Sequence, residues 1–549
     1  MAKNVLYTGD NLRILREYVA DETADLIYLD PPFKSDQDYN VLFAEQDGTR
    51  AAAQIKAFED TWRWDQTAAE AYREVVERGG RVSETMQGFQ KMLGGCDMLA
   101  YLSMMAPRLV ELGRVLKPTG SLYLHCDPTA SHYLKMLLDA VFGPRAFVNE
   151  IVWQRTNARS TKGRWPRLHD VLLYYCPGQP VTYNPIAVKA GAAKMPHTLI
   201  RAGDGQTYQT YELTAPGVTK EGGSGKPWRG FDPATMGRHW ANSPKQMDKW
   251  DAAGLIHWPK GGGWPRRRDA KPFEVEDRTI IVGDVWTDID RINQAAKERL
   301  GYPTQKPVAL LARIISASSK PGDVVLDPFC GCGTTIHAAQ HLGRQWIGID
   351  ITFLATNLIK TRLLDAFGPS IGGSFNEVGE PESLQDARAL AERDRYQFQW
   401  WVLGRVGARA TETARKKGAD QGIDGRLYFH DENKGTKTKQ IILSVKSGDA
   451  GVKDIRDLCH VVARERAEIG VLITLQEPSR PMRAEAAGFG TYRSPWGEHP
   501  RCQILTVAEL LEGKGIDYPP ARQVNVTFKR APRAQDEAGE QLSLAPRKR

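Results

Sequence analysis

Cysteine is scarce in this sequence, and long hydrophobic runs are absent. Seven scattered cysteines in 549 residues argue against a disulfide framework and for a reducing compartment, so we expect a cytoplasmic protein. No stretch approaches the roughly 18 uncharged apolar residues of a membrane span, and no leader-like segment precedes the first strand-like residues. Cys330 and Cys332 lack a second Cys or His pair at zinc spacing, so we interpret them as small residues in a tight loop.

The length and charge leave several functions open. At roughly 100–200 residues per domain, the chain is long enough for three or four domains. The net charge of +8 is compatible with a nucleic-acid partner but does not establish one.

One stretch is typical of a buried parallel strand that stops at a carboxylate: Ala24-Asp-Leu-Ile-Tyr-Leu-Asp30-Pro31-Pro32-Phe33. The two prolines fix the backbone as it leaves the sheet, where ligands of open α/β sheets bind. A flat heterocycle could stack on Phe33 while its amino group donates to the Asp30 carboxylate and the Pro31 carbonyl. The alternative is an ordinary strand-to-loop turn with a buried phenylalanine.

Two further strand–acid units lie near residue 330. Asp327-Pro-Phe329-Cys-Gly331-Cys-Gly333-Thr334 joins an acid to a glycine loop and a helix start, which favours a ligand with anionic groups close to the backbone. The next strand ends at Asp350, at the spacing where an acid commonly holds a ribose. Position 336 is Ile where a dinucleotide fingerprint has its third glycine, which favours another adenosine cofactor.

Short strands and helices alternate through residues 1–175, which predicts an α/β domain. Asp10 follows the first strand and can accept from a ligand amino group or cap the next helix; the two roles are compatible. Residues 34–90 are polar and irregular, which favours a mobile loop over a site.

Together these motifs resemble the DNA amino-methyltransferases of the N4-cytosine/N6-adenine family, in the circular order that places Asp-Pro-Pro-Phe before Phe-x-Gly-x-Gly. The resemblance implies a Rossmann-like methyltransferase sheet, circularly permuted, whose first two strands end at Asp327 and Asp350 and whose third and fourth end at Asp10 and Asp30. The matching stretches are Thr8–Asp10, Asp30–Phe33, Tyr302–Pro307, Asp327–Gly333 and Gly348–Asp350.

The resemblance also implies a cofactor and residue roles. Asp30, Pro31, Pro32 and Phe33 are expected to hold an extruded base and orient its amino nitrogen. Aspartate at position 30 is similar to the adenine-modifying members, with N4-cytosine as the alternative. S-adenosylmethionine is the expected cofactor, and the residues expected to bind it are Asp10, Thr304, Lys306, Asp327, Phe329, Gly331, Gly333, Thr334 and Asp350.

Residues 176–300 occupy the place of the family's target-recognition region, and here tryptophans alternate with basic residues. Basic side chains can contact phosphates or guanine edges, so double-stranded DNA is the expected partner. The alternative is an insertion whose tryptophans form a small core of their own. The residues expected to contact DNA are Arg229, Arg238, Lys260, Arg266, Arg267 and Arg268.

Residues 396–520 resemble the PD-(D/E)xK core of Mrr-like restriction endonucleases, an α/β fold. Asp424 and Lys446 match the metal-binding acid and the lysine, but Ser444 stands where an acid or amide is usual. Cleavage would require Mg²⁺ at Asp424. The alternative is a domain that grips DNA without cutting it.

The expected organisation is therefore a methyltransferase catalytic half (1–175), a target-recognition region (176–300), an S-adenosylmethionine-binding half (301–365), a linker (366–395), a nuclease-fold domain (396–520) and a tail that is disordered at its end (521–549). We expect a DNA adenine methyltransferase with a restriction-endonuclease-like domain, as in restriction–modification. An RNA or protein-glutamine substrate and an inactive DNA-binding scaffold remain alternatives. The sequence leaves a homodimer open.

Overall fold

The structure, a computed structural model, describes residues 4–32, 64, 66–158, 161, 163–179, 182–189, 199–201, 206–219, 222–259, 261–271, 279–293, 296, 298–300, 302, 304–410, 422–431, 438–519 and 542–543. The chain divides into two compact units, residues 1–184 with 283–539 and residues 185–282 with 540–549. Phe33, Lys260 and all of the expected tail 521–549 except residues 542–543 lie outside the described residues.

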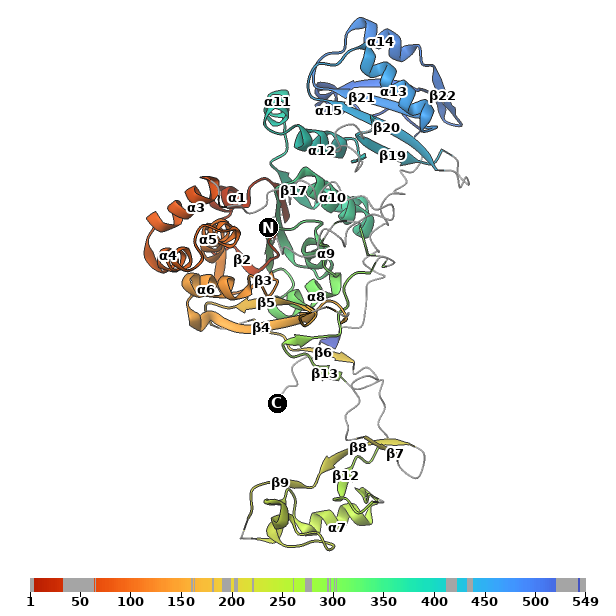
Figure 1. The fold of residues 1–549 in the computed structure, drawn as a ribbon. Coiled ribbons are helices and arrows are strands. Elements are labelled where there is room, and N and C mark those ends of the chain that lie inside the picture. The colour runs from red at the N-terminus through yellow and green to blue at the C-terminus, as the bar shows by residue number, and fades with distance from the viewer. Residues whose placement is uncertain are drawn as a thin grey trace. The chain divides into compact units, whose positions relative to one another are not determined.

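The first unit is built on a nine-stranded sheet with a parallel centre (Figure 1). Leu26, Ile27 and Leu29 of the central strand β2 are fully buried, as expected for a parallel strand covered on both faces. The predicted α/β fold is confirmed. In spatial order the strands are β14 (Val285–Trp286), β4 (Phe147–Gln154), β5 (His169–Tyr175), β3 (Leu116–Cys126), β2 (Ala24–Leu29), β15 (Val324–Asp327), β16 (Gln345–Asp350), β1 (Asn4–Thr8) and β17 (Phe375–Val378).

Helices cover both faces of this sheet (Figure 1). One layer contains α1 (Asn11–Tyr18), α3 (Gln66–Glu77), α4 (Gly80–Leu93), α5 (Asp97–Val115) and α6 (Ser131–Phe142), which contact one another. The other contains α8 (Val308–Ser318), α9 (Thr334–His341) and α10 (Phe353–Phe367). Single 3₁₀ turns occur at Pro144–Ala146 and Pro369–Gly373.

The prediction of a loop at residues 34–90 is wrong for residues 66–90. Residues 66–77 and 80–93 form helices α3 and α4, and residues 33–63 lie outside the described part of the chain. Tyr72, Val75, Met86 and Phe89 are buried in the main core. The charged residues that made this segment look irregular belong to the outer faces of amphipathic helices.

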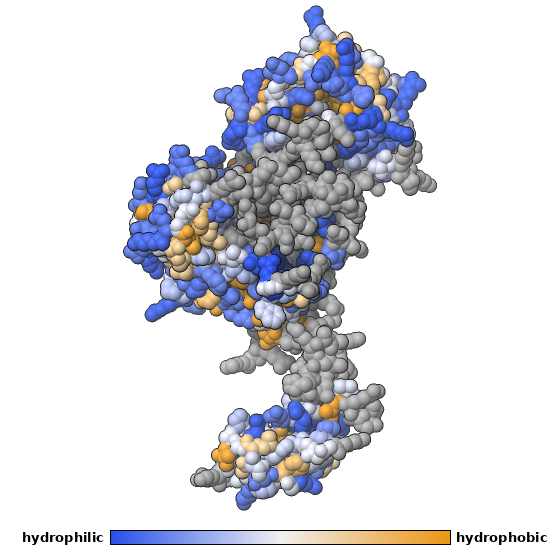
Figure 2. Space-filling model, in the orientation of Figure 1, coloured by the Kyte–Doolittle hydropathy of each residue, from blue (hydrophilic) through white to orange (hydrophobic). Residues whose placement is uncertain are grey.

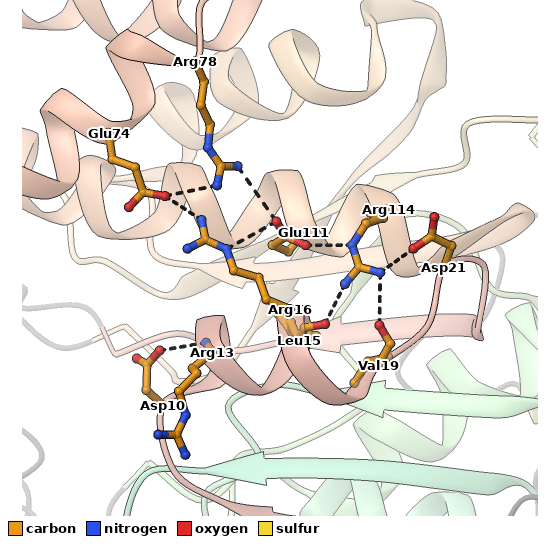
Figure 3. A network of polar contacts seen from close by, with 10 residues as sticks. All are labelled: Asp10, Arg13, Leu15, Arg16, Val19, Asp21, Glu74, Arg78, Glu111 and Arg114. Atoms are coloured by element: carbon orange, nitrogen blue, oxygen red, sulfur yellow. Dashed lines mark hydrogen bonds and ion pairs between the residues drawn. The ribbon is translucent and has the colours of Figure 1, made fainter.

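A polar network ties α3 to α1 and α5 (Figure 3). Glu111 of α5 is 8% exposed and accepts from Arg16 of α1 at 3.4 Å and from Arg114 at 2.7 Å. Glu74 of α3 accepts from the same Arg16 at 2.6 Å and from Arg78 at 3.1 Å. These shared ion pairs make the helical segment an integral part of the unit.

The expected linker at 366–395 contains regular structure. Phe375–Val378 forms the edge strand β17, which pairs with β1 in parallel, and Leu384–Arg393 forms helix α11. The sheet therefore continues beyond the expected boundary at residue 365.

A five-stranded sheet forms the C-terminal domain, in the order β18 (Arg409–Ala410), β19 (Gly425–Phe429), β20 (Lys439–Lys446), β21 (Ile469–Thr474) and β24 (Cys502–Thr506). Two buried clusters hold the strands between helices. The helices are α12 (Arg395–Arg405), α13 (Val452–Arg464), α14 (Arg480–Ala487) and α15 (Val507–Leu511), and a hairpin joins β22 (Thr491–Ser494) to β23 (Gly497–Pro500).

In its described residues, the second unit contains small sheets and the α-helix α7 (Pro244–Ala252). Trp228, Trp240, Met247 and Ile256 form its buried centre. The sheets are β11 (Ile256–His257), β12 (Arg266–Arg268), β8 (Thr207–Glu212) and β7 (Leu199–Arg201); β13 (Thr279–Ile281), β6 (Ile186–Lys189) and β25 (Leu542–Ser543); and β10 (Arg238–Trp240) with β9 (Thr214–Pro216). Short 3₁₀ turns occur at Gly223–Gly225 and Pro233–Met236.

No helix in the described part of the chain has the length and apolar character that crossing a bilayer requires. On the face seen in Figure 2, hydrophilic residues cover much of the described surface, with smaller hydrophobic patches between them.

Candidate active site

Four acidic residues lie at one edge of the large sheet, where four adjacent parallel strands end. The strands β2, β15, β16 and β1 are neighbours in that order. Asp30 follows β2, Asp327 ends β15, Asp350 ends β16, and Asp10 comes two residues after β1. Because carboxyl ends of parallel strands meet at the same edge, residues more than 300 positions apart in the chain share one site.

Asp30 is partly buried and accepts a hydrogen bond from the Nζ of Lys306. Pro31 is buried directly behind it and Pro32 is half-buried. Lys306 belongs to the segment before α8, in which Thr304 has a left-handed backbone with φ of +61°. The structure therefore joins two motifs that are 276 residues apart in the sequence.

Asp327 is a nearly fully buried carboxylic group, 2% exposed. Burial raises its pKa to about 7, although the Phe329 amide donates to it at 3.0 Å and counteracts this; the charges of Asp30 and Asp350 act in the same direction as burial. A carboxylate in this position favours a cationic ligand, since a positive charge would stabilise its ionised form.

The glycine loop between β15 and α9 depends on two left-handed residues, Gly331 (φ +50°) and Gly333 (φ +73°). A side chain at Gly333 would also collide with Ile359 of α10, 2.7 Å from its Cβ. The loop can therefore approach neighbouring groups only with glycine at these positions. Thr334, the first residue of α9, is buried and accepts from Arg362 at 3.0 Å.

Asp350 connects the glycine loop to β16, the strand that ends at Asp350. Its Oδ2 accepts from the Gly331 amide at 3.0 Å, and its Oδ1 accepts from the Thr352 amide and hydroxyl at 2.9 and 3.0 Å. Burial raises its pKa to about 6, against these hydrogen bonds. A carboxylate has about four acceptor positions, so ligand hydroxyl groups can still be accommodated.

Asp10 caps α1, as the sequence allowed. Its Oδ1 accepts from the Arg13 amide at 3.0 Å (Figure 3), and its Oδ2 pairs with Arg108 of α5 at 2.6 Å. The side chain remains 45% exposed. It can therefore cap the helix and still accept from a ligand.

Sequence reasoning missed several residues of this edge. Arg108 pairs with Asp10, and Arg362 of α10 donates to the Cys332 carbonyl at 3.2 Å behind the glycine loop. Tyr28, His125 and Asp170 form a buried polar array beside Asp30. His125 could have been found from the sequence, because a histidine lies near the end of an otherwise apolar strand and an acid-containing turn follows. The other contacts leave no local pattern in the sequence.

Five of the arginines expected to contact DNA have partners within the second unit. Arg229 pairs with Asp248 and Asp251, and Arg238 pairs with Glu212 at 2.8 Å. The β12 arginines are also engaged: Arg266 donates to Thr210 at 3.0 Å, Arg267 lies over the Tyr211 and Trp250 rings, and Arg268 lies over Tyr208. The tryptophans form a core, which was the alternative interpretation; DNA contact by the arginines stays a prediction.

In the C-terminal domain the nuclease candidates are connected to each other and to the backbone. Asp424 Oδ2 accepts from the Ser444 hydroxyl at 3.1 Å and from the Val445 amide at 2.7 Å. Lys446 pairs with Asp454 at 3.3 Å. Among the residues that the structure describes, no group of three or more His, Cys, Asp or Glu side chains could hold a metal ion. Mg²⁺ therefore has no support here.

Comparison with known proteins identifies the large sheet. Residues 24–360 match the N6/N4 methyltransferase family described as DNA methylase. The chain belongs to this DNA methylase family. A relative of this methylase, the type II methyltransferase M.EcaI of Enterobacter cloacae, is 29% identical over 399 residues, 72% of this chain and 77% of the relative.

Two further relatives of the methylase match over shorter spans. The DNA adenine methyltransferase YhdJ of Escherichia coli is 54% identical over 86 residues, 16% of this chain and 28% of that protein. The StyLTI Mod subunit of a type III restriction–modification enzyme from Salmonella typhimurium is 26% identical over 372 residues, 62% of this chain and half of that protein.

The C-terminal domain of the methylase matches a second family. Residues 395–512 match the one described as NACHT-associated inactive Restriction Endonuclease 1. The domain is therefore restriction-endonuclease-like, and the family description agrees with the serine at position 444.

The residues of the methylase site fit S-adenosylmethionine, which membership of a methyltransferase family implies. Asp30, Asp327 and Asp350 gather negative charge at one edge, and this cofactor carries an ammonium and a sulfonium group against one carboxylate. Burial raises the pKa of Asp327, and a bound cation would lower that pKa again because it stabilises the ionised carboxylate. The left-handed glycines keep Cβ atoms out of the loop that follows.

Proposed function

We propose that this methylase transfers a methyl group from S-adenosylmethionine to the exocyclic amino nitrogen of adenine in double-stranded DNA. The observation that carries the proposal is the position of Asp30 at the end of β2, beside the strand that ends at buried Asp327 and in contact with Lys306. Aspartate at position 30 and the adenine methyltransferase among the relatives favour adenine.

In this proposal the chain supplies orientation. The Asp30 carboxylate and the Pro31 carbonyl accept the two amino hydrogens of an extruded base, which directs the nitrogen lone pair toward the methyl group that S-adenosylmethionine supplies. Lys306 holds Asp30 through Oδ2, so that Oδ1 remains to accept from the base. Phe33, outside the described residues, would stack on the base. Flipping the base costs roughly a few kcal/mol.

The cofactor would be held by the other strand ends. Asp327, Phe329 and the Gly331–Gly333 loop with Thr334 would face its methionine end, with Thr304 and Lys306 near its carboxylate. Asp350 would take the ribose and Asp10 the adenine amino group. Asp10 and Asp350 already lie at the ends of adjacent strands, which are joined there by a hydrogen bond from the Gly9 amide to the Asp350 carbonyl at 2.9 Å.

The same strand order supports a circular permutation. β15 and β16, which carry the cofactor motifs, are central in the sheet but late in the sequence. β1 and β2 come first in the chain yet flank this pair on either side. A chain with the cofactor strands first could keep every strand at the same place in the sheet. Circular permutation of this kind is tolerated because the termini of a domain often lie close together.

We infer that the C-terminal domain binds DNA without cutting it. Ser444 is a weak metal ligand, and it donates to Asp424 instead of supplying a second acid. Asp424 Oδ2 is already engaged by the Ser444 hydroxyl and the Val445 amide, and no second carboxylate stands at position 444 to share a metal ion. N4-cytosine modification is the alternative for the methylase itself, since the family includes both kinds of enzyme.

Methyl transfer by Asp30→Ala tests the proposal. We expect tritium transfer from labelled S-adenosylmethionine to unmethylated genomic DNA to fall at least a hundredfold, because the base loses one of its two acceptors. Binding of S-adenosylhomocysteine should survive, since Asp30 is not assigned to the cofactor. Retained transfer in this variant would contradict the proposal.

A further inference from the structure

A buried polar array crosses three neighbouring strands beside Asp30. Tyr28 lies on β2, His125 on β3 and Asp170 on β5, and these strands are adjacent in the sheet. The three residues are only 2%, 2% and 5% exposed. We propose that Tyr28, His125 and Asp170 are positioning residues that fix the strand end carrying Asp30 for methyl transfer. This inference rests on the proposed role of Asp30.

The contacts form an unbroken series. The Tyr28 hydroxyl lies 2.9 Å from His125 Nδ1, and His125 Nε2 lies 3.3 Å from Asp170 Oδ2. The imidazole is set edge-on to the Tyr28 ring at 81° and to the Trp153 ring at 88°, which leaves it little room to turn. Asp170 also forms an ion pair with Arg155 at 3.1 Å, just after β4.

The protonation states are mutually consistent. Burial raises the pKa of Tyr28 well above its ordinary value, and the charge of Asp30 raises it further, so the phenol stays neutral. Burial alone would raise the pKa of Asp170, but the hydrogen bond and charge of His125, with Arg155 and Lys306, lower it below its ordinary value, so Asp170 is a carboxylate. This carboxylate can accept from Nε2–H, and the Tyr28 hydroxyl lies within hydrogen-bonding distance of Nδ1, so both ring nitrogens have a partner.

The array bears on Asp30 through the backbone. Tyr28 lies in β2 two residues before Asp30, which follows the end of that strand, and the charge of Asp30 acts on the Tyr28 phenol. The hydrogen bond of the Tyr28 hydroxyl therefore limits movement of the backbone between Tyr28 and Pro31, the segment that carries Asp30. Asp170 contributes a second time, because its charge acts on Lys306, which holds Asp30 directly.

The need to fill the core does not by itself explain why these three residues are polar. Three polar side chains in a core are costly unless all are hydrogen-bonded, and an apolar set would fill the same space. Their value lies in direction: a hydrogen-bonded series defines an orientation that apolar packing does not. A displacement of about 1 Å at a reacting group can slow a reaction roughly a hundredfold.

The test measures the single-turnover rate of methyl transfer by the full-length protein, with saturating tritiated S-adenosylmethionine and unmethylated genomic DNA. The variants are Tyr28→Phe, Asp170→Asn and the double variant. Tyr174→Phe is the matched control, because Tyr174 is a buried phenol of the same sheet, 3% exposed, whose hydroxyl lies 3.3 Å from Ser121. S-adenosylhomocysteine affinity and the unfolding temperature are measured for each.

We expect Tyr28→Phe to slow transfer about tenfold to a hundredfold while cofactor affinity stays within twofold, and Tyr174→Phe to keep the wild-type rate. Residues that act as a unit are non-additive, so the double variant should be no slower than the slower single variant by more than twofold. If Asp170→Asn does not fold, Tyr28→Phe against Tyr174→Phe still decides, because each removes one oxygen atom.

Three results would overturn the inference: a Tyr28→Phe rate within twofold of wild type, equal losses in Tyr28→Phe and Tyr174→Phe, or single-variant losses that multiply in the double variant. Failure of the proposed function is a separate result. In that case Asp30→Ala retains transfer, whereas an inactive Asp30→Ala with a fully active Tyr28→Phe contradicts the positioning role alone.

Discussion

At the scale of single residues, Asp327 couples ligand binding to pH. Its pKa of about 7 reflects burial without a cationic partner. A bound ammonium or sulfonium group would favour the ionised carboxylate, so binding at lower pH must first remove a proton. Affinity for a cationic ligand should therefore be full above pH 7 and decline as the pH falls below it.

We predict that the dissociation constant of S-adenosylhomocysteine, which keeps the ammonium group, rises roughly tenfold per pH unit below 7 and is flat between pH 7.5 and 8.5. Titration calorimetry at several pH values measures this. In Asp327→Asn the affinity should be weaker at pH 8 and should lack the decline around pH 7, which leaves only the change centred near pH 6 that Asp350 contributes. A flat wild-type profile would refute the assignment.

Lys306 is the second residue whose substitution leads to a specific prediction. It pairs with Asp30 and also lies close enough to Asp170 to influence its pKa. We predict that Lys306→Met weakens S-adenosylhomocysteine binding about tenfold and slows methyl transfer further, because both the ligand carboxylate and Asp30 lose their cation. Lys320→Met, at an exposed position after α8, is the control and should bind normally. Equal affinity in the two variants argues against the role.

At the scale of elements, helix α10 supports the glycine loop from behind. Ile359 lies where a side chain at position 333 would be, and buried Arg362 donates to the Cys332 carbonyl and to Thr334. Asn357 on the same helix donates to the Trp400 carbonyl of α12 at 3.0 Å. One helix therefore joins the cofactor loop to the C-terminal domain.

We predict that Arg362→Met lowers the free energy of unfolding by about 2 kcal/mol, since it leaves buried acceptors without a donor. It should also weaken S-adenosylhomocysteine binding several-fold, because the loop loses its support. Denaturant unfolding and calorimetry measure the two effects. Arg393→Met, exposed on α11, should change neither. Unchanged binding in Arg362→Met would show that the loop is rigid without α10.

The strand ends could be predicted from the sequence because each carries a local pattern: an apolar run, an acid, then proline or glycine. Asp30, Asp327 and Asp350 were found in this way. Their partners could not be, since Lys306 and Arg108 meet their carboxylates only through folding. Helices α3 and α4 were missed because surface charges obscured a buried stripe that includes Tyr72 and Phe89.

At the scale of the whole molecule, the C-terminal domain keeps a nuclease fold whose central acid is engaged. Asp424 accepts from Ser444 and from the Val445 amide, so it ties the start of strand β19 to the last residues of β20. The domain's family is described as inactive. Its role would then be to hold DNA for the methylase.

We predict that the full-length protein leaves duplex DNA uncut in the presence of Mg²⁺, with or without S-adenosylmethionine. Asp424→Ala should lower the stability of the domain by about 1–2 kcal/mol, because the partly buried Val445 amide loses its acceptor, without changing the DNA pattern on a gel. Cutting that requires the metal and disappears in Asp424→Ala would contradict this account.

The most direct test of the central claim is modification mapping of genomic DNA from cells that express the wild-type chain or Asp30→Ala. The account predicts N6-methyladenine at one recurring sequence with the wild-type chain and at none with the variant. Modification that persists in Asp30→Ala, or a wild-type chain that modifies no DNA base, would contradict it; N4-methylcytosine would keep the site and change the base.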